Sequence, residues 1–332
     1  MNAIEFENCS VIFGDRPARA LELADDARDR AEIEAETGHV LGVHDATLSV
    51  DEGEIVVLMG LSGSGKSTLL RAVNGLNPVA RGDVRVRMGD AMVSVPQASR
   101  NTLRKLRLNH VSMVFQQFGL LPWRSVAHNV GLGMELAGTA RAERERRVSA
   151  QLVNVGLDGW ADRPVGELSG GMQQRVGLAR AFATEAPILL MDEPFSALDP
   201  LIRTRLQDEL LALQRQTGRS ILFVSHDLDE AFKLGNRIAL MEGGRIVQTG
   251  TAREIIASPA SDYVADFVAH MNPLDVLTAG DLATDGTAEG SALPADLPLK
   301  QVLAALADSA ARPVSGGGVV QRADVLRRLS GS

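Results

Sequence analysis

The sequence predicts an α/β fold with a β-rich beginning, a parallel sheet flanked by helices, a helical segment and a small C-terminal tail. Short apolar runs within 55–59, 188–191 and 219–226 each suit one buried strand. Helix-like stretches lie between these runs, as connections between parallel strands require. A glycine-rich stretch follows the first run almost directly and opens a helix, which is the arrangement of a phosphate-binding loop.

The composition is that of an ordinary globular protein. Of its 332 residues, 45% are apolar and 23% are charged, so the length supports one large domain and a smaller unit. The net charge of −8 argues against a nucleic-acid-binding surface, which is usually basic. Cys9 is the one cysteine, so a disulfide within the chain is excluded and a reducing compartment fits. Neither a membrane span nor a signal peptide is evident, and we expect a cytosolic protein that can dock on a membrane protein.

The elements are expected to alternate along the chain. In the first part we expect a strand over 4–13, a helical insert within 18–36, the buried strand 55–59, and a helix ended by Gly75 and Pro78. In the second part we expect helices over about 122–183, strands within 186–194 and 219–226, and a hairpin that turns at Gly243 and Gly244. After Asn272 the composition shifts to Ala, Gly, Asp and Pro, which predicts a linker or a small separate unit.

The strongest motif is GLSGSGKST at 60–68, between the predicted strand and helix. Its glycines let backbone N–H groups and the helix N-terminus face a phosphate, as in a P-loop. Lys66 would neutralise phosphate charge, Ser67 would bind Mg²⁺, and Thr68 would reach the α-phosphate. A chance Gly/Ser-rich loop is the alternative that this context disfavours. The predicted nucleotide-binding residues of the loop are Gly60, Ser62, Gly63, Gly65, Lys66, Ser67 and Thr68.

Polar residues follow several of the apolar runs. Asp192 ends the run ILLM, where it would hold Mg²⁺, and the adjacent Glu193 would orient or deprotonate an attacking water. Gln116 follows another run and could reach Mg²⁺ or that water, and His226 could hydrogen-bond the γ-phosphate. Taken alone, Gln116 and His226 also fit a strand-end glutamine and a surface histidine.

A second glycine-rich stretch, LSGG at 168–171, has no phosphate-binding lysine. The order of P-loop, Gln116, LSGG, MDEP, SALD and His226 resembles the ATP-binding cassette (ABC) ATPase over about 4–269. The resemblance implies a P-loop NTPase (RecA-like) core and a helical signature subdomain over about 117–183, within a domain of residues 1–270. It also implies ATP and Mg²⁺ as cofactors.

In this family two cassettes pair head to tail, and the signature of one binds the γ-phosphate held by the other. The resemblance therefore implies that Ser169, Gly170 and Gly171 serve the partner's nucleotide, while the same glycines also start a helix. It places Asp199 of SALD in the loop that couples the two sites. It places Phe13 where an aromatic residue stacks on adenine, although a core phenylalanine is an equal alternative.

The segment around 118–130 matches the region that receives the coupling helix of the membrane subunit, with Leu120, Leu121 and Trp123 as docking residues. Three features resemble the ATPases of importers for quaternary amines and osmoprotectants. They are the insert, the residues around the P-loop and the stretch SALDPLIRTRLQDELLALQ. QQFGLLPWRSV favours choline, with glycine betaine and proline next. Such ATPases commonly end in a pair of CBS modules. The tail 271–332 is too short for a pair, but it resembles the end of one module.

The resemblance implies a homodimer that powers two membrane permease subunits from the cytoplasmic face of the membrane. An extracytoplasmic solute-binding protein would deliver the substrate, and no nucleic acid is involved. Two alternatives remain open: an importer ATPase for another small solute and, more distantly, a soluble ABC-type ATPase that acts on nucleic acid. The residues do not indicate what the acidic insert 18–36 does. Because every ATP-site motif lies upstream of the tail, we expect the tail to regulate or stabilise rather than to catalyse.

Overall fold

The structure is a computed structural model that describes residues 1–269 and 276–330. Its chain forms two compact units. The first unit holds residues 1–226 and 239–246, and the second holds 227–238 and the described residues from 247 onward. The predicted boundary between 270 and 271 lies outside the described residues.

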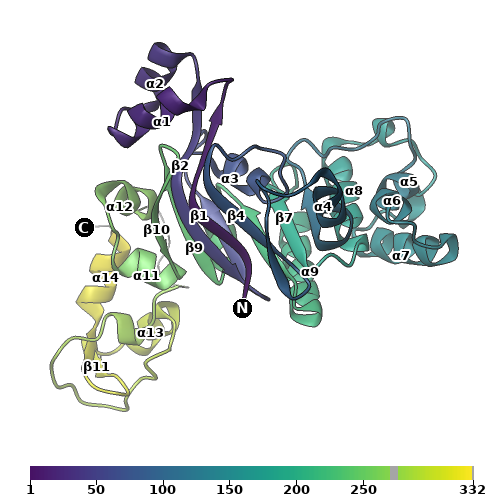
Figure 1. Ribbon diagram of the computed structural model, residues 1–332. Coiled ribbons are helices and arrows are strands. Elements are labelled where there is room, and N and C mark those ends of the chain that lie inside the picture. The colour runs from purple at the N-terminus through teal and green to yellow at the C-terminus, as the bar shows by residue number, and fades with distance from the viewer. Residues whose placement is uncertain (270–275, 331–332) are drawn as a thin grey trace. The chain divides into compact units, whose positions relative to one another are not determined.

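Two sheets organise the first unit (Figure 1). One is antiparallel in the order β2-β1-β4-β5, and the other has the order β10-β9-β3-β8-β7-β6. The pairs β3–β8, β8–β7 and β7–β6 are parallel, which confirms the predicted α/β fold. The strands are β1 (Asn2–Phe13), β2 (Val40–Asp51), β3 (Ile55–Met59), β4 (Arg81–Met88), β5 (Ala91–Ser94), β6 (Val111–Val114), β7 (Ile188–Asp192), β8 (Ser220–Val224), β9 (Arg237–Glu242) and β10 (Arg245–Gly250).

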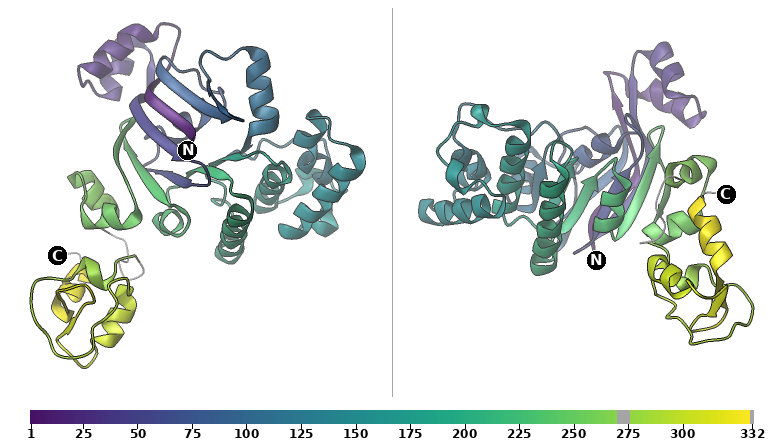
Figure 2. Two further views of the ribbon diagram at one scale, coloured as in Figure 1. Left: turned by 60° about the horizontal axis from the view of Figure 1, so that its bottom comes forward. Right: turned by 180° about the vertical axis from the view of Figure 1, so that it is seen from behind.

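Helices connect the parallel strands, and α5 to α8 form the helical segment that was predicted over about 122–183 (Figures 1 and 2). Helices α5, α6 and α7 all contact α8. None of the helices in the described ranges combines the length and the apolar character that crossing a membrane requires. The helices of the first unit are α1 (Pro17–Asp25), α2 (Arg30–Thr37), α3 (Lys66–Ala72), α4 (Arg100–Lys105), a π-helical turn (Leu106–His110), α5 (Val126–Val130), α6 (Leu132–Leu136), α7 (Arg141–Asn154), α8 (Gly170–Ala183) and α9 (Pro200–Thr217).

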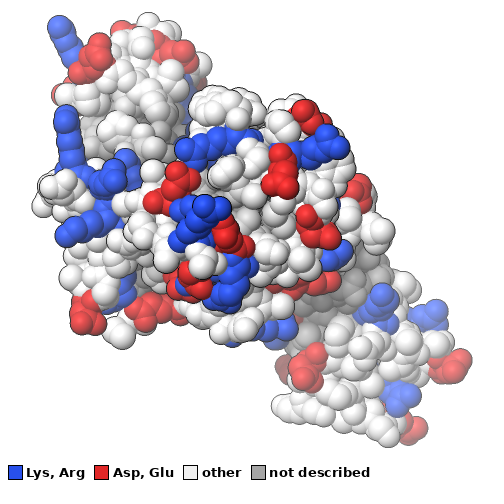
Figure 3. All heavy atoms as spheres, turned by 90° about the vertical axis from the view of Figure 1, so that its right-hand side faces the viewer, with Lys and Arg blue, Asp and Glu red and all other residues white. Residues whose placement is uncertain are grey.

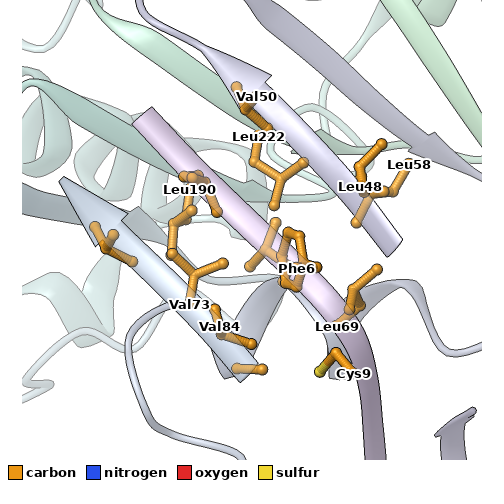
Figure 4. Close-up of a cluster of buried hydrophobic side chains, with 14 of the residues drawn as sticks. Phe6, Cys9, Leu48, Val50, Leu58, Leu69, Val73, Val84, Leu190 and Leu222 are labelled. Carbon is orange, nitrogen blue, oxygen red and sulfur yellow. The ribbon is translucent and has the colours of Figure 1, made fainter. Parts of the chain in front are cut away.

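One apolar core joins the two sheets of the first unit (Figure 4). Phe6 of β1 and Val84 of β4 face this core from the antiparallel sheet, and Leu190 and Leu222 face it from the parallel sheet. Helix α3 contributes Leu69 and other residues to it. Because α3 starts at the end of the P-loop, burial of its apolar side chains fixes the loop against β3.

The insert is two helices rather than one continuous helix over 19–36. Ala27 has a φ of +60° between α1 and α2, and Asp29 caps α2 in a capping box with Glu32. Such a cap satisfies the N–H groups that are left free at the start of a helix, so a new helix begins after Asp29. A separate small core holds the pair against β1 and β2, with Ile12, Ala20, Leu23, Ala24, Ile33 and Leu41 buried in it.

The second unit combines short helices with a two-stranded antiparallel pair of β11 and β12. Its core includes Leu299, Val302 and Leu306, which are fully buried. Arg253 of α11 forms an ion pair with Asp281 within this unit. Its elements are α10 (Leu228–Leu234), α11 (Ala252–Ala257), α12 (Asp262–Val268), α13 (Leu299–Ala305), β11 (Ala311–Pro313), β12 (Val319–Gln321) and α14 (Arg322–Ser330).

Candidate nucleotide-binding site

The P-loop connects the end of β3 to the start of α3, as the sequence predicts. Gly60, Gly63 and Gly65 have φ values of 139°, 80° and 102°, which favour glycine. At Gly60 a Cβ would lie 2.1 Å from the carbonyl oxygen of Met241, so only glycine fits between the two backbones. Close backbone contacts therefore constrain the conformation of the loop.

Lys66 begins α3, and its ammonium group is held inside the loop. Its Nζ donates hydrogen bonds to the carbonyl oxygens of Gly60 at 2.8 Å and Leu61 at 2.9 Å. Burial lowers the pKa of Lys66, while the charges of Glu193 and Asp192 act in the opposite direction. A buried cation in this position is suited to a phosphate group, which would stabilise its charged form.

A pocket of about 290 Å³ brings most of the predicted site together. A larger cavity of about 550 Å³, lined mainly by α5 and α7, contains none of the predicted site residues. We assign function to the smaller pocket because the charged and glycine-rich residues meet there. It is lined by Phe13, Arg30, Val40, Leu41, Gly42, Ser62, Gly63, Gly65, Lys66, Ser67, Thr68, Gln116 and Glu193.

Two side chains with oxygen atoms suited to magnesium, Ser67 and Asp192, contact each other beside this pocket. The Ser67 hydroxyl donates to Asp192 Oδ1 at 2.6 Å, and the Asp192 side chain is fully buried. Arg71 donates to the other carboxylate oxygen at 2.8 Å, a partner that the sequence did not indicate. A hydroxyl and a carboxylate match the hard oxygen ligands that Mg²⁺ prefers, and such sites use few protein ligands together with phosphates and water. The residues present therefore fit this ion.

Glu193 is the point where the three predicted catalytic residues meet. Gln116 Nε2 donates to Glu193 Oε2 at 3.2 Å, and His226 Nδ1 lies 3.4 Å from the same oxygen. Glu193 has a φ of +49°, a left-handed conformation that is rare for a residue with a side chain. Its N–H donates to the carbonyl of Val224 in β8, which holds the strained backbone in place.

Phe13 is the last residue of β1 and is 42% exposed. Its side chain lines the same pocket as the P-loop. The alternative interpretation of Phe13 as a core phenylalanine is therefore wrong. The position next to the P-loop is compatible with stacking on a nucleobase.

The LSGG stretch lies apart from the P-loop pocket. Ser169 caps α8 by accepting a hydrogen bond from the Met172 N–H at 3.4 Å, so the stretch does start a helix. Ser169, Gly170 and Gly171 are not among the described residues that line the pocket. Asp199 caps α9 in the same way and accepts from the Ile202 N–H at 3.0 Å.

Gln174 is a functional candidate that the sequence did not indicate. It is 1% exposed, and its Nε2 donates to the carbonyl of Glu193 at 3.2 Å. Its Oε1 accepts from the N–H of Ala197 at 3.0 Å. Gln174 thus ties the signature helix α8 to the loop that follows β7. No local pattern distinguishes it from the adjacent Gln173.

Part of the predicted docking segment, around 118–130, is exposed to solvent. Trp123 is 76% exposed, and Leu120 and Leu121 are partly exposed. An exposed tryptophan of this kind is typical of a contact surface for another protein.

Comparison with known proteins gives consistent results. The ABC transporter family matches residues 43–196. The glycine betaine/proline betaine transport ATP-binding protein ProV of Salmonella typhimurium is 49% identical over 280 residues, covering 84% of this chain and 69% of that protein. The trimethylamine N-oxide transport ATP-binding protein TmoW of Ruegeria pomeroyi is 43% identical, covering 90% and 87%. A dimeric structure of a bacterial ABC transporter cassette matches with a TM-score of 0.64 and 28% identity, covering 75% of this chain and 98% of that chain.

The match with ProV extends over most of both chains, and the structural match covers nearly the whole of the solved cassette. The P-loop, the acidic pair Asp192 and Glu193 at the end of β7, and LSGG are the motifs that the chain shares with this family. The chain therefore belongs to the ABC transporter ATPases, which couple ATP hydrolysis to transport across a membrane.

Proposed function

We propose that this ATPase energises the import of glycine betaine, proline betaine or a related methylated amine. The observation that carries the proposal is the similarity to ProV and TmoW, whose transport substrates all carry a methylated nitrogen. Choline shares the trimethylammonium group of glycine betaine, and it is the member of this group that the sequence around Trp123 favours. An importer of another small solute is the alternative.

In this proposal the P-loop binds the ATP phosphates. The backbone N–H groups around Gly63 and Gly65 and the N-terminus of α3 face the phosphates, and Lys66 neutralises part of their charge. Thr68 reaches the α-phosphate, and Phe13 stacks on the adenine. The support is that these residues line a single pocket.

Ser67 and Asp192 would hold Mg²⁺, with Gln116 reaching it from the end of β6. When bound, the ion neutralises charge on the terminal phosphates. Arg71 keeps the buried carboxylate of Asp192 oriented by its hydrogen bond to Oδ2.

Glu193 would accept the proton of the attacking water. Its side chain is 18% exposed, so water can reach it. Gln116 and His226 lie at the same carboxylate oxygen, where they can orient the water and the γ-phosphate. Gln174 holds the Glu193 carbonyl and thereby helps to fix the direction of the side chain.

The signature would act on the nucleotide of a second subunit in a homodimer. The N-terminus of α8 carries Ser169, Gly170 and Gly171, and none of them reaches the described P-loop pocket of its own chain. A helix start with small residues can bind a phosphate supplied from outside. Asp199 would lie in the loop that couples the two sites.

The other proposed partners are two membrane permease subunits, docked around Trp123, and a solute-binding protein on the outer side. The subunit would thus be cytoplasmic and peripheral on the inner face of the membrane. The face shown in Figure 3 has basic and acidic side chains side by side, which does not favour nucleic acid as a partner.

The decisive variant for hydrolysis is Glu193→Gln. It removes the base but keeps the size of the side chain, so ATP should still bind while turnover falls by about two to four orders of magnitude. The variant should accumulate as an ATP-bound dimer in gel filtration. Near-normal turnover would remove Glu193 from this role.

For the substrate, the wild-type ATPase and its permease subunits should be reconstituted in proteoliposomes with the solute-binding protein. We expect ATP-driven uptake of glycine betaine, proline betaine or choline, and no uptake with Glu193→Gln. Uptake of none of the three would favour the other-solute alternative. Turnover stimulated by DNA or RNA would favour the distant alternative of a nucleic-acid ATPase.

A further inference from the structure

The insert helices α1 and α2 contribute one side chain to the P-loop pocket. That residue is Arg30, the first residue of α2, directly after the capping residue Asp29. It lines the pocket together with Phe13 and the P-loop residues, and it is the one insert residue in the lining. The insert therefore does more than cover β1 and β2.

The guanidinium of Arg30 is directed at the backbone of the P-loop. Nη1 donates to the carbonyl oxygen of Gly63, and Nη2 donates to the carbonyl oxygen of Gly42 in β2. Nε is buried without a hydrogen-bond partner in the described part of the chain. An Arg side chain has five N–H donors, so donors remain for a ligand in the pocket.

Glycines make room for this guanidinium. At Gly244 a Cβ would lie 2.6 Å from Nη2, and at Gly65 it would lie 3.4 Å from the same atom. Both glycines also have positive φ values, of 89° and 102°. A niche built in this way holds the side chain at one place beside the loop.

The charge of Arg30 is not neutralised by a carboxylate in the pocket. Burial lowers its pKa, but a guanidinium stays charged at every relevant pH. The pocket lining thus contains two cations, Arg30 and Lys66, and one carboxylate, Glu193. Two fixed cations suit a polyphosphate better than an uncharged nucleoside.

We propose that Arg30 is a nucleotide-affinity residue, through which the insert adds a second fixed positive charge to the ATP site. The inference rests on the proposed nucleotide-binding role of this pocket. It predicts an effect on binding that grows with the number of phosphates. It predicts a larger effect on binding than on the hydrolysis step, because the hydrogen bonds of Arg30 go to the carbonyls of Gly63 and Gly42.

The test uses Arg30→Gln, Arg30→Lys and the matched control Arg28→Gln in the full chain. Arg28 belongs to the same insert, and its substitution removes the same charge. It is exposed, pairs with Glu32 and lies outside the pocket lining. Dissociation constants for ATP and for adenosine would be measured by calorimetry at low and high salt. The turnover at saturating ATP would be measured alongside.

We expect Arg30→Gln to weaken ATP binding about tenfold at low salt, as for the loss of one charge-assisted contact, and to change adenosine binding by less than about twofold. Arg30→Lys should fall between Arg30→Gln and the wild type, and Arg28→Gln should match the wild type. The loss should shrink only modestly at high salt, because a partly buried charge is screened less than an exposed one. Turnover at saturating ATP should fall by a smaller factor than the affinity for ATP.

Equal loss of ATP and adenosine binding would overturn the inference, because the effect would not depend on phosphate charge. A loss in Arg30→Lys as large as in Arg30→Gln would overturn it too, because it would show that Arg30 only holds the loop in shape. The inference would also be overturned if Arg30→Gln bound ATP as the wild type does while Lys66→Ala lost ATP binding. That result would leave the proposed nucleotide site intact. Unchanged ATP binding in Lys66→Ala would instead contradict the proposed site itself. If Arg30→Gln fails to fold, the comparison of Arg30→Lys with Arg28→Lys at both salt concentrations decides the matter in the same way.

Discussion

The proposed action of LSGG on a partner's nucleotide can be tested by mixing two inactive variants. Lys66→Ala disables the P-loop of its own chain. For the signature, the structure selects Gly170→Asp rather than a change at Gly171. A Cβ at Gly170 meets no atom within 4 Å, whereas at Gly171 it would lie 3.2 Å from the Ala197 carbonyl oxygen. Gly170 is the first residue of α8, where an aspartate suits the helix N-terminus, so the fold should be kept.

The expected effect follows from electrostatics. An aspartate and a phosphate charge about 4 Å apart, at an effective dielectric constant of about 20, repel by about 4 kcal/mol. A loss of that size weakens closure of the site by about a thousandfold. The variant Gly170→Asn has nearly the same size without the charge and should keep much of the activity.

Each single variant should therefore be inactive as a homodimer. In a mixed dimer, one composite site carries both lesions and the other carries none. Random pairing makes about half of the dimers mixed, so about a quarter of the wild-type sites are restored. Single-turnover ATP hydrolysis of the mixture, with heterodimers verified by two different tags, measures this. If verified heterodimers turn over no faster than either parent, the signature acts within its own chain and the reasoning is refuted.

Three further outcomes are expected. The pKa of Asp25 is held well below its usual range by Arg81 and His44, so its pairing stabilises the fold above about pH 4 and this contribution is lost as the pH falls further. Because Asp25 is about half exposed, Asp25→Asn should lower the free energy of unfolding by at most about 1 kcal/mol at pH 7, and urea titrations should show this difference shrinking as the pH falls below about 4. Burial raises the pKa of Cys9 to about 12, so a maleimide should label it only on unfolding; rapid labelling at pH 8 would contradict this. A chain ending at Ala269 should keep its ATPase activity and nucleotide affinity, and an inactive but folded truncation would assign the tail to the catalytic unit.

The meeting of Asp192, Glu193 and His226 could be predicted from the sequence, because it depends only on where parallel strands end. Asp192 ends β7 and His226 follows β8, and the carboxyl ends of such parallel strands meet at one edge of the sheet. The P-loop follows a third strand of the same sheet, so its place was predictable as well. The roles of these residues stay predictions until variants are measured.

Other features could not be predicted because they depend on distant contacts. Strands β4 and β5 were not expected, since the arginine-rich stretch 81–88 becomes a strand by pairing with β1. Arg30 reaches Gly63, 33 residues away, only once the insert is packed on β1 and β2. Gln174 is buried by the docking of α8 against the loop after β7, and glutamine is usually an exposed residue.

The left-handed backbone conformation at Glu193 lowers the stability of the fold at a residue that is proposed to act in hydrolysis. A residue with a side chain in this conformation costs about 1–2 kcal/mol, and glycine would avoid that cost. Glycine at this position would therefore give a more stable chain, and the proposed role of Glu193 in hydrolysis is a reason for a glutamate to stand there instead. The backbone angle at position 193 thus marks a residue on which the proposed activity and the stability of the chain make opposite demands.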